Sequence, residues 1–419
     1  MCTGLVPKGI RPGRRSSMRI LIYGMNHAPE FTGVGRYTGE IAAHLVARGH
    51  DVRVVTAPPH YPGWRASANY SAKRWSRETL DGATVYRCPL YLSDEMRGIK
   101  RLMASFSFAL SSSPVVLWQT LTWRPEVVMT LEPTLLGAPA AILGAKLCGA
   151  RLVLQVQDLE VDAAFAMGHL RGNLAASLAN GFERICLRAF DRIITISDRM
   201  AERIAAKGVK PERIDMIRNW VDVGQIQPLA APSRYRHELE LGERFVALYS
   251  GALGAKQGVN LLIKAAQRLA GRTDIVMVVA GDGPMRGALE EAAKTAPNLI
   301  VLPFQPEARF SEFLGLADVH LLPQERGAAD LVLPSKLGGM LASGRPILVT
   351  ADPGTELADF LVDAAVCTPP GDIKAMADGI EILANAGAPH VRQARRLELA
   401  RSLSKTEGLL TFERSLLGE

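Results

Sequence analysis

Short glycine-containing segments follow three stretches that are typical of apolar strands. Gly33 and Gly35 follow RILIYG, Gly251 and Lys256 follow RFVALY, and Gly281 and Gly283 follow DIVMVVA. Glycine lets the backbone approach a ligand closely, and backbone amides together with one lysine suit a diphosphate. These segments therefore predict phosphate or nucleotide contacts. A plain tight turn is the alternative for Gly33 and Gly281, and an exposed loop lysine is the alternative for Lys256.

Two further segments carry polar groups that could take part in chemistry. Ser335 and Lys336 follow Pro334, and this order predicts a helix start whose free amides and lysine could hold a diphosphate. Asp158 follows the apolar stretch ARLVLQV, where a carboxylate could act as an acid or base or hold a sugar hydroxyl. A helix N-cap is the alternative role for Asp158. We predict no metal site.

The elements that must position these residues alternate regularly between apolar strands and helices. This rhythm runs to about residue 219, breaks in the Pro- and Gly-containing stretch 219–236, and then restarts. It predicts an α/β protein with two doubly wound, Rossmann-like parallel sheets that face each other across a cleft. The Gly33 segment lacks the GxGxxG pattern, and no acidic residue ends the second strand, so a dinucleotide site is disfavoured.

Charge and cysteine usage narrow the class of protein. The formal net charge is +7, but four of these positive charges lie in residues 1–17, which contain no acidic residue. Nucleic-acid binding is therefore not expected. The five scattered cysteines form no CxxC pattern and fit a reducing cytoplasm. We expect a disordered basic leader over 1–17, with Met18 a candidate start, and domains over 18–222 and 223–395. A helical segment over 396–419 is expected to pack back on the first domain.

Residues 102–123 contain no charged side chain but include five serines, so a buried or interfacial helix is favoured over a membrane span. The basic residues Arg97, Lys100 and Arg101 precede this stretch. On a helix beginning near Glu95, they would suit attachment to anionic lipid. A core helix with one solvated end is the alternative.

Three longer segments together resemble the family-4 retaining glycosyltransferases. These are MRILIYGMNHAPEFTGVGRYTGEIA, ITISDRMAERIAAKGV with the later NWVD, and ADLVLPSKLGGMLASGRPI. They are most similar to the branch assigned to colanic-acid-type exopolysaccharide synthesis, whose members are described as fucosyltransferases. The resemblance covers nearly everything from Met18 onward. It implies the GT-B architecture, a nucleotide-sugar donor held by the second domain, and an acceptor held by the first. It also implies a metal-independent reaction with retention.

The sequence departs from the family pattern at several positions that carry function there. Gln157 stands where many relatives have a histidine that supports the reacting sugar, and Ala252 stands where a phosphate-binding arginine is common. The family's ribose-binding glutamate falls at Gly339, and its partner glutamate falls near Asp330 or Leu331. Lys336 is expected to take over charge.

The resulting hypothesis is a cytoplasmic glycosyltransferase, peripheral on the inner face of the membrane. Its donor would be a GDP- or UDP-linked sugar, which is a co-substrate and not a cofactor, and its acceptor a lipid-linked glycan. Asp158, Lys256 and Lys336 are the predicted catalytic residues. Two alternatives remain, a non-catalytic nucleotide-sugar-binding subunit and a UDP-sugar 2-epimerase.

Overall fold

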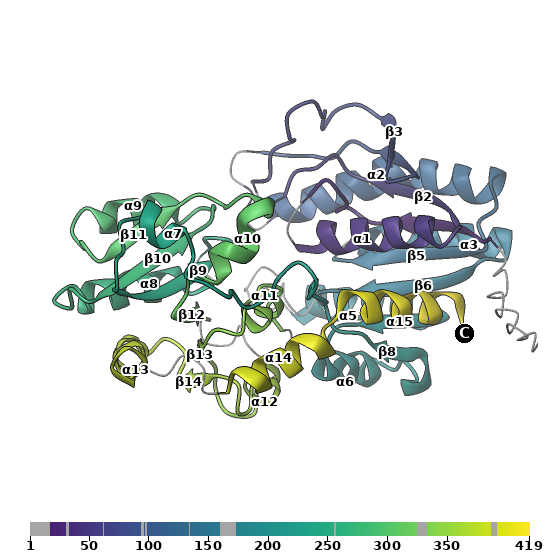
Figure 1. Cartoon of the computed structure of the whole chain (residues 1–419). Coiled ribbons are helices and arrows are strands. Elements are labelled where there is room, and N and C mark those ends of the chain that lie inside the picture. Colours follow the sequence, from purple (N-terminus) through teal and green to yellow (C-terminus); the bar gives the residue numbers. More distant parts are fainter. Residues whose placement is uncertain are drawn as a thin grey trace, which may run out of the picture.

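The structure of this chain is a computed structural model. It describes residues 17–30, 33–61, 63–93, 96, 99–133, 135–159, 173–254, 257–324, 333–386 and 392–419. Most of the leader, Lys256, and the Asp330–Leu331 position therefore lie outside the described residues. Within the described part, the chain forms two α/β units, each with its own sheet (Figure 1).

The first unit is built on an eight-stranded sheet of order β3-β4-β2-β1-β5-β6-β7-β8. The strands are β1 (Arg19–Tyr23), β2 (Asp51–Thr56), β3 (Ser76–Leu80), β4 (Ala83–Arg87), β5 (Val127–Glu132), β6 (Arg151–Val156), β7 (Arg192–Thr195) and β8 (Ile214–Met216). All neighbours pair in parallel except β3, which runs antiparallel to β4 at one edge. The carboxyl ends of the parallel strands therefore meet at one side of the sheet.

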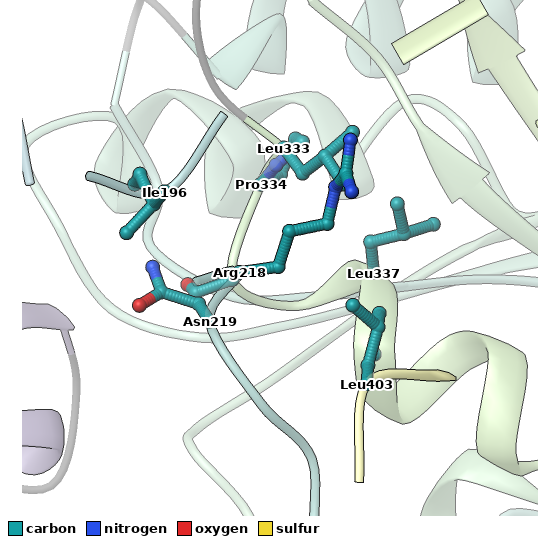
Figure 2. Close-up of a pocket in the computed structure, with 9 residues that line it drawn as sticks. Ile196, Arg218, Asn219, Leu333, Pro334, Leu337 and Leu403 are labelled. Carbon is teal, nitrogen blue, oxygen red and sulfur yellow. The ribbon is translucent and has the colours of Figure 1, made fainter. Parts of the chain in front are cut away.

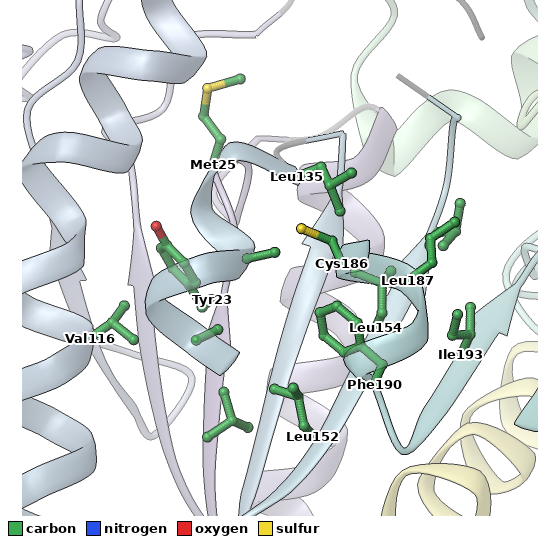
Figure 3. Packing of buried hydrophobic residues seen from close by; sticks show 14 of the residues in the cluster. Tyr23, Met25, Val116, Leu135, Leu152, Leu154, Cys186, Leu187, Phe190 and Ile193 are labelled. Carbon is green, nitrogen blue, oxygen red and sulfur yellow. The ribbon is translucent and has the colours of Figure 1, made fainter. Parts of the chain in front are cut away.

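Helices cover both faces of this sheet because side chains alternate along its buried strands. Leu21 and Tyr23 pack with α2 (Ile99–Thr122), α3 (Ala138–Cys148) and α5 (Asn173–Ala189), as Figure 3 shows for part of this cluster. Ile20 and Ile22 pack on the other side with α1 (Gly33–Ala47) and α15 (Lys405–Leu417). The remaining elements of this unit are α6 (Asp198–Ala206) and the short helices η1 (Leu135–Gly137) and η2 (Pro211–Arg213).

The second unit contains a six-stranded parallel sheet of order β11-β10-β9-β12-β13-β14. Its strands are β9 (Phe245–Ser250), β10 (Ile275–Ala280), β11 (Leu299–Leu302), β12 (Val319–Leu322), β13 (Ile347–Thr350) and β14 (Val366–Thr368). Its helices are α7 (Tyr235–Glu238), α8 (Val259–Arg268), α9 (Arg286–Ala293), α10 (Glu307–Leu314), α11 (Leu337–Ala342), α12 (Glu356–Phe360), α13 (Ile373–Ala386) and α14 (Gln393–Ser402). The chain leaves β9 toward β10 and later returns to β12 on its other side. Doubly wound sheets bind ligands at such a switch point.

The chain crosses between the two units twice, and the two crossings lie side by side. The Val221 amide donates to the Leu403 carbonyl over 2.7 Å, and the Lys405 amide donates to the Val221 carbonyl over 2.9 Å. After the second crossing, α15 packs on the first sheet, where Phe412 contacts the Trp220 ring at 6.3 Å between centroids.

The sequence analysis predicts the two-sheet α/β architecture, and the structure confirms it. Two element boundaries differ from expectation. Helix α1 begins at Gly33 and not near Thr38, so Gly35 lies in its first turn rather than in a loop. Helix α11 begins at Leu337 and not at Ser335, with Lys336 as its N-cap. No helix among the described residues is both long and apolar enough to cross a bilayer.

Candidate active site

The loops after β9 and β10 pack against each other through their backbones. The Gly251 amide donates to the Ala280 carbonyl, and the Leu253 amide donates to the Asp282 carbonyl, both over 2.9 Å. Gly281 has a φ of +156°, and a Cβ there would overlap the carbonyl oxygen of Gly251. A Cβ at Gly283 would lie 2.6 Å from the Leu253 carbonyl oxygen. These glycines are needed because the two loops leave no room for a side chain.

Lys336 reaches from the turn before α11 to the end of β9. Its Nζ donates to the Tyr249 hydroxyl over 2.8 Å and lies 4.0 Å from the centroid of the same ring. The Tyr249 hydroxyl donates in turn to the Ala252 carbonyl over 2.7 Å. A Cβ at Gly251 would lie 3.3 Å from Lys336 Nζ. The sequence-predicted residues Gly251, Gly281, Gly283 and Lys336 therefore come together at the switch point beside β9.

The Lys336 ammonium group is held without a charge partner in the described part of the chain. Burial lowers its pKa to about 7. Among the described residues no carboxylate lies within ion-pair distance of it, and its hydrogen-bond partner is a neutral phenol. A lysine that is partly desolvated and lacks a carboxylate partner favours the binding of an anion, because the anion would stabilise the protonated form of the lysine.

Ser335 lies beside Lys336 but faces the first unit. It is exposed and lines a small pocket where the two units meet, together with Arg218 and Asn219 of the first unit (Figure 2). Asn219 and Gln157 form a reciprocal amide pair, with N–O distances of 2.9 and 3.0 Å. This pair fixes the Gln157 side chain at the end of β6. Sequence reasoning placed Gln157 at a strand end but missed Asn219, its partner 62 residues away.

Arg218 links the two units at the rim of this pocket. One guanidinium nitrogen donates to Asp198 of α6 and to Glu356 of α12, each over 2.8 Å. Arg218 also contacts a larger open cavity of about 520 Å³ between α6 and α12. The hydrogen bond from Arg218 to Glu356 therefore depends on how the two units are positioned relative to each other. No sequence motif indicates this role of Arg218, because its acidic partners lie 20 and 138 residues away in the chain.

Asp158, Gly33 and Gly35 belong to the first unit. Asp158 is exposed two residues after β6, so its side chain is accessible at the carboxyl end of the sheet. Gly33 has a φ of +62°, and a Cβ at Gly35 would overlap the Glu30 carboxylate. Glu30 accepts hydrogen bonds from the His60 and Tyr61 amides, each over 3.0 Å. Gly35 therefore leaves the space that the Glu30 side chain occupies.

The positions that depart from the family pattern are occupied as follows. Gly339 is buried, and a Cβ there would meet Leu314 at 3.1 Å and Ile226 at 3.6 Å. A carboxylate that binds a ribose requires a polar environment, whereas the side chains around Gly339 are apolar. Ala252 contributes its carbonyl oxygen to the Tyr249 hydroxyl. Lys256 lies outside the described residues.

Comparison with known proteins identifies both units. Residues 32–220 match the glycosyl transferase 4-like domain, and residues 244–386 match the glycosyl transferases group 1 family. The chain is 41% identical over 374 residues to WcaI of Escherichia coli strain K12, covering 87% of this chain and 91% of WcaI. The name of WcaI assigns it to colanic acid biosynthesis as a glycosyl transferase.

Solved structures share the fold at low sequence identity. A sucrose-phosphate synthase of Thermosynechococcus elongatus aligns with a TM-score of 0.71 and 16% identity, over 95% of this chain and 98% of that chain. HepE of Anabaena, solved in complex with UDP and glucose, aligns with a TM-score of 0.68 and 14% identity, over 96% of this chain and 100% of that chain. The chain therefore belongs to the GT-B glycosyltransferases that combine a glycosyl transferase 4-like domain with a group 1 domain.

Proposed function

We propose that this glycosyltransferase moves a sugar from a GDP- or UDP-linked donor onto a lipid-linked glycan in exopolysaccharide synthesis. The donor diphosphate would bind at the switch point of the second domain, against the Gly251 loop and Lys336. Lys256 and Ser335 would extend this site. The observation that carries the proposal is the Lys336 ammonium, which lies over the Gly251 loop with no carboxylate partner among the described residues.

The chemistry of the leaving group explains why so few acid–base residues are needed. A nucleoside diphosphate leaves as an anion, so departure requires charge stabilisation more than proton transfer. Lys336, extended by Lys256, would supply it without a metal ion. The proposal therefore includes metal independence. It also includes retention at the anomeric carbon, which the family resemblance implies. Asp158 would contact the sugar or acceptor, and closure of the units would exclude water.

A non-catalytic nucleotide-sugar-binding subunit is the second candidate. It is favoured by Gln157, whose amide is held by Asn219 and cannot transfer a proton, and by the apolar surroundings of Gly339. A UDP-sugar 2-epimerase is a weaker third candidate, because the acidic and histidine residues for epimerisation are not evident in the sequence.

A thermal-shift screen against GDP-, UDP- and ADP-sugars tests the proposal first, since a ligand that binds the native state raises the melting temperature. We expect one nucleotide class to stabilise the wild type and to stabilise Lys336→Gln much less. Hydrolysis or transfer of that donor then separates an enzyme from a binder. No stabilisation by any nucleotide sugar would contradict the proposed donor site.

A further inference from the structure

Helix α2 presents a continuous apolar face to solvent. The large side chains on this face are 46–69% exposed: Leu102, Met103, Phe106, Leu110, Trp118 and Leu121. Phe106, Leu110, exposed Pro114 and Trp118 follow one another at four-residue spacing. Residues at this spacing share one side of a helix. From Leu102 to Leu121 the row extends about 28 Å at 1.5 Å per residue. The neighbouring helix α3 continues the face with Leu143 and Leu147, which are 50% and 58% exposed.

The inner face of the same helix is the more polar one. Ser105, Ser112, Gln119 and Thr120 are buried there beside Ala104, Phe108, Ala109 and Val116, whereas the large exposed side chains of the outer face are all apolar. Ser112 is within 2.8 Å of the Tyr23 hydroxyl, and Gln119 accepts from Arg53 over 2.8 Å. A surface helix of a water-soluble domain ordinarily has the reverse arrangement, with polar residues outside. The polarity of α2 therefore fits an apolar environment on its outer side.

A basic rim runs along one flank of this face. The segment before β3 places Trp75, which is 61% exposed, against α2, where its indole nitrogen donates to the Ser111 carbonyl over 3.2 Å. Exposed Lys73 and Arg74 precede Trp75. Farther along, Arg77 lies over the Tyr86 ring at 5.6 Å, and Tyr86 contacts Trp118 at 5.8 Å. Tryptophans and cations beside an apolar face suit the headgroup region of an anionic bilayer.

We propose that the outer face of α2, extended by α3 and rimmed by Lys73, Arg74 and Arg77, docks on an anionic lipid bilayer. Helix α2 would lie in the plane of the interface, with its apolar row among the acyl chains. This surface differs from the cluster expected from sequence. Arg97 lies outside the described residues, and Arg101 donates to the Met96 carbonyl and lies over Trp64. Lipid is favoured over a second copy of the chain because a second copy would bring another basic rim to an already basic surface.

The docking surface also has a consequence for the acceptor, which rests on the proposed function. The first turn of α2 lies beside the loop that carries Tyr61 and Trp64, since Arg101 is 5.4 Å from the Trp64 ring centroid. Tyr61 in turn contacts the Gly33 position at the start of α1. The docked protein would therefore hold the first-domain side of the cleft near the headgroups. A glycan on a membrane-embedded lipid could enter there without leaving the bilayer.

Vesicle co-sedimentation tests the docking. Wild type is compared with Phe106→Ser/Leu110→Ser and with Lys73→Gln/Arg74→Gln/Arg77→Gln, on phosphatidylglycerol-containing and pure phosphatidylcholine vesicles. Ile382→Ser, at an exposed site on α13, and Lys294→Gln/Lys374→Gln, at exposed sites of the second domain, are the controls. We expect wild type and controls to bind anionic vesicles and to be released by salt. The basic triple variant should bind roughly 100-fold more weakly, because each basic residue near the surface contributes about fivefold.

The apolar double variant should bind roughly 100-fold more weakly, since each buried Leu or Phe side chain contributes roughly tenfold. Bromine-labelled acyl chains should quench the fluorescence of wild type more than that of Trp118→Phe. If wild type stays in the supernatant at low salt, or if both the apolar double variant and the basic triple variant bind normally, the proposal is wrong. A lipid-free dimer that Leu110→Ser dissociates, without vesicle binding, would assign the face to a second copy and overturn the proposal. Donor stabilisation in the thermal-shift screen should be unchanged in the apolar double variant and the basic triple variant, so failure of docking and failure of the donor site are distinguishable.

Discussion

Substitution of Lys336 by glutamine should remove a proton that nucleotide-sugar binding takes up. In the free protein, burial lowers the pKa of Lys336 to about 7. A diphosphate beside Nζ would favour the charged lysine and move its pKa back toward its ordinary value. Because the pKa is lower in the free state than in the complex, binding takes up a proton above pH 7 and weakens as the pH rises.

The size of the effect follows from the free-state pKa. With that pKa at about 7, binding should take up about 0.9 proton at pH 8 and about 0.1 at pH 6. The dissociation constant should then be about tenfold larger at pH 8 than at pH 6. The phosphates of a nucleotide sugar remain ionised across this range, so they add no proton of their own. At pH 6, Lys336→Gln should weaken binding by about 1–3 kcal/mol, the usual contribution of a charged hydrogen bond.

Titration calorimetry in two buffers of different ionisation enthalpy measures the proton uptake directly. Wild type should show the uptake at pH 8, Lys336→Gln should show none, and its affinity should be independent of pH. Lys294→Gln is the matched control, since Lys294 is exposed and paired with Glu291. The reasoning fails if wild type takes up no proton at pH 8, or if Lys336→Gln takes up as much as wild type.

Four further outcomes follow from the same structure. Gly281→Ala should separate the β9 and β10 loops, lower the free energy of unfolding by roughly 1–3 kcal/mol and weaken donor binding. Thermal melting and calorimetry measure these effects, and normal donor binding would mean that the close approach to Gly251 is dispensable. Gln157→Leu leaves the Asn219 amide without its partner and should lower stability by about 1–3 kcal/mol in urea unfolding, whereas an unchanged midpoint would show that the pair contributes nothing. Glu413→Gln removes the carboxylate that accepts from His44 over 2.9 Å, and it should loosen α15 and raise hydrogen exchange there above that of wild type. Transfer should survive EDTA, and restoration by Mg²⁺ or Mn²⁺ of an activity lost to EDTA would disprove metal independence.

The central strands of the second sheet are predictable from sequence because they are buried on both faces. β10 reads as an unbroken apolar run, IVMVVA, and every residue in it is buried. Strand β3 is not predictable from sequence, for the opposite reason. Its sequence, SRETL, is polar and largely exposed at a sheet edge, and its pairing with β4 depends on a neighbour rather than on its own composition.

The glycines of the candidate site are also predictable, since close backbone approach requires this residue type. Their partners are not predictable in the same way. The Gln157–Asn219 pair and the Lys336–Tyr249 contact join residues 62 and 87 positions apart, and only the tertiary fold brings them together. The outer face of α2 was obscured for another reason. Hydropathy averaged along residues 102–123 mixes the serines of the inner face with the leucines of the outer one, and the two faces separate only when the buried side of the helix is known.

The central claim is that this chain transfers a sugar from a nucleotide diphosphate to a lipid-linked glycan. Its most direct test uses the donor found by thermal shift together with lipid-linked glycans extracted from bacterial membranes. Mass spectrometry then follows the acceptor and the released nucleotide together. We expect the acceptor to gain one sugar residue for each nucleoside diphosphate released, and Lys336→Gln to reduce both equally. Donor that is bound but never consumed with acceptor present, or donor converted to its C2 epimer without acceptor, would contradict the claim.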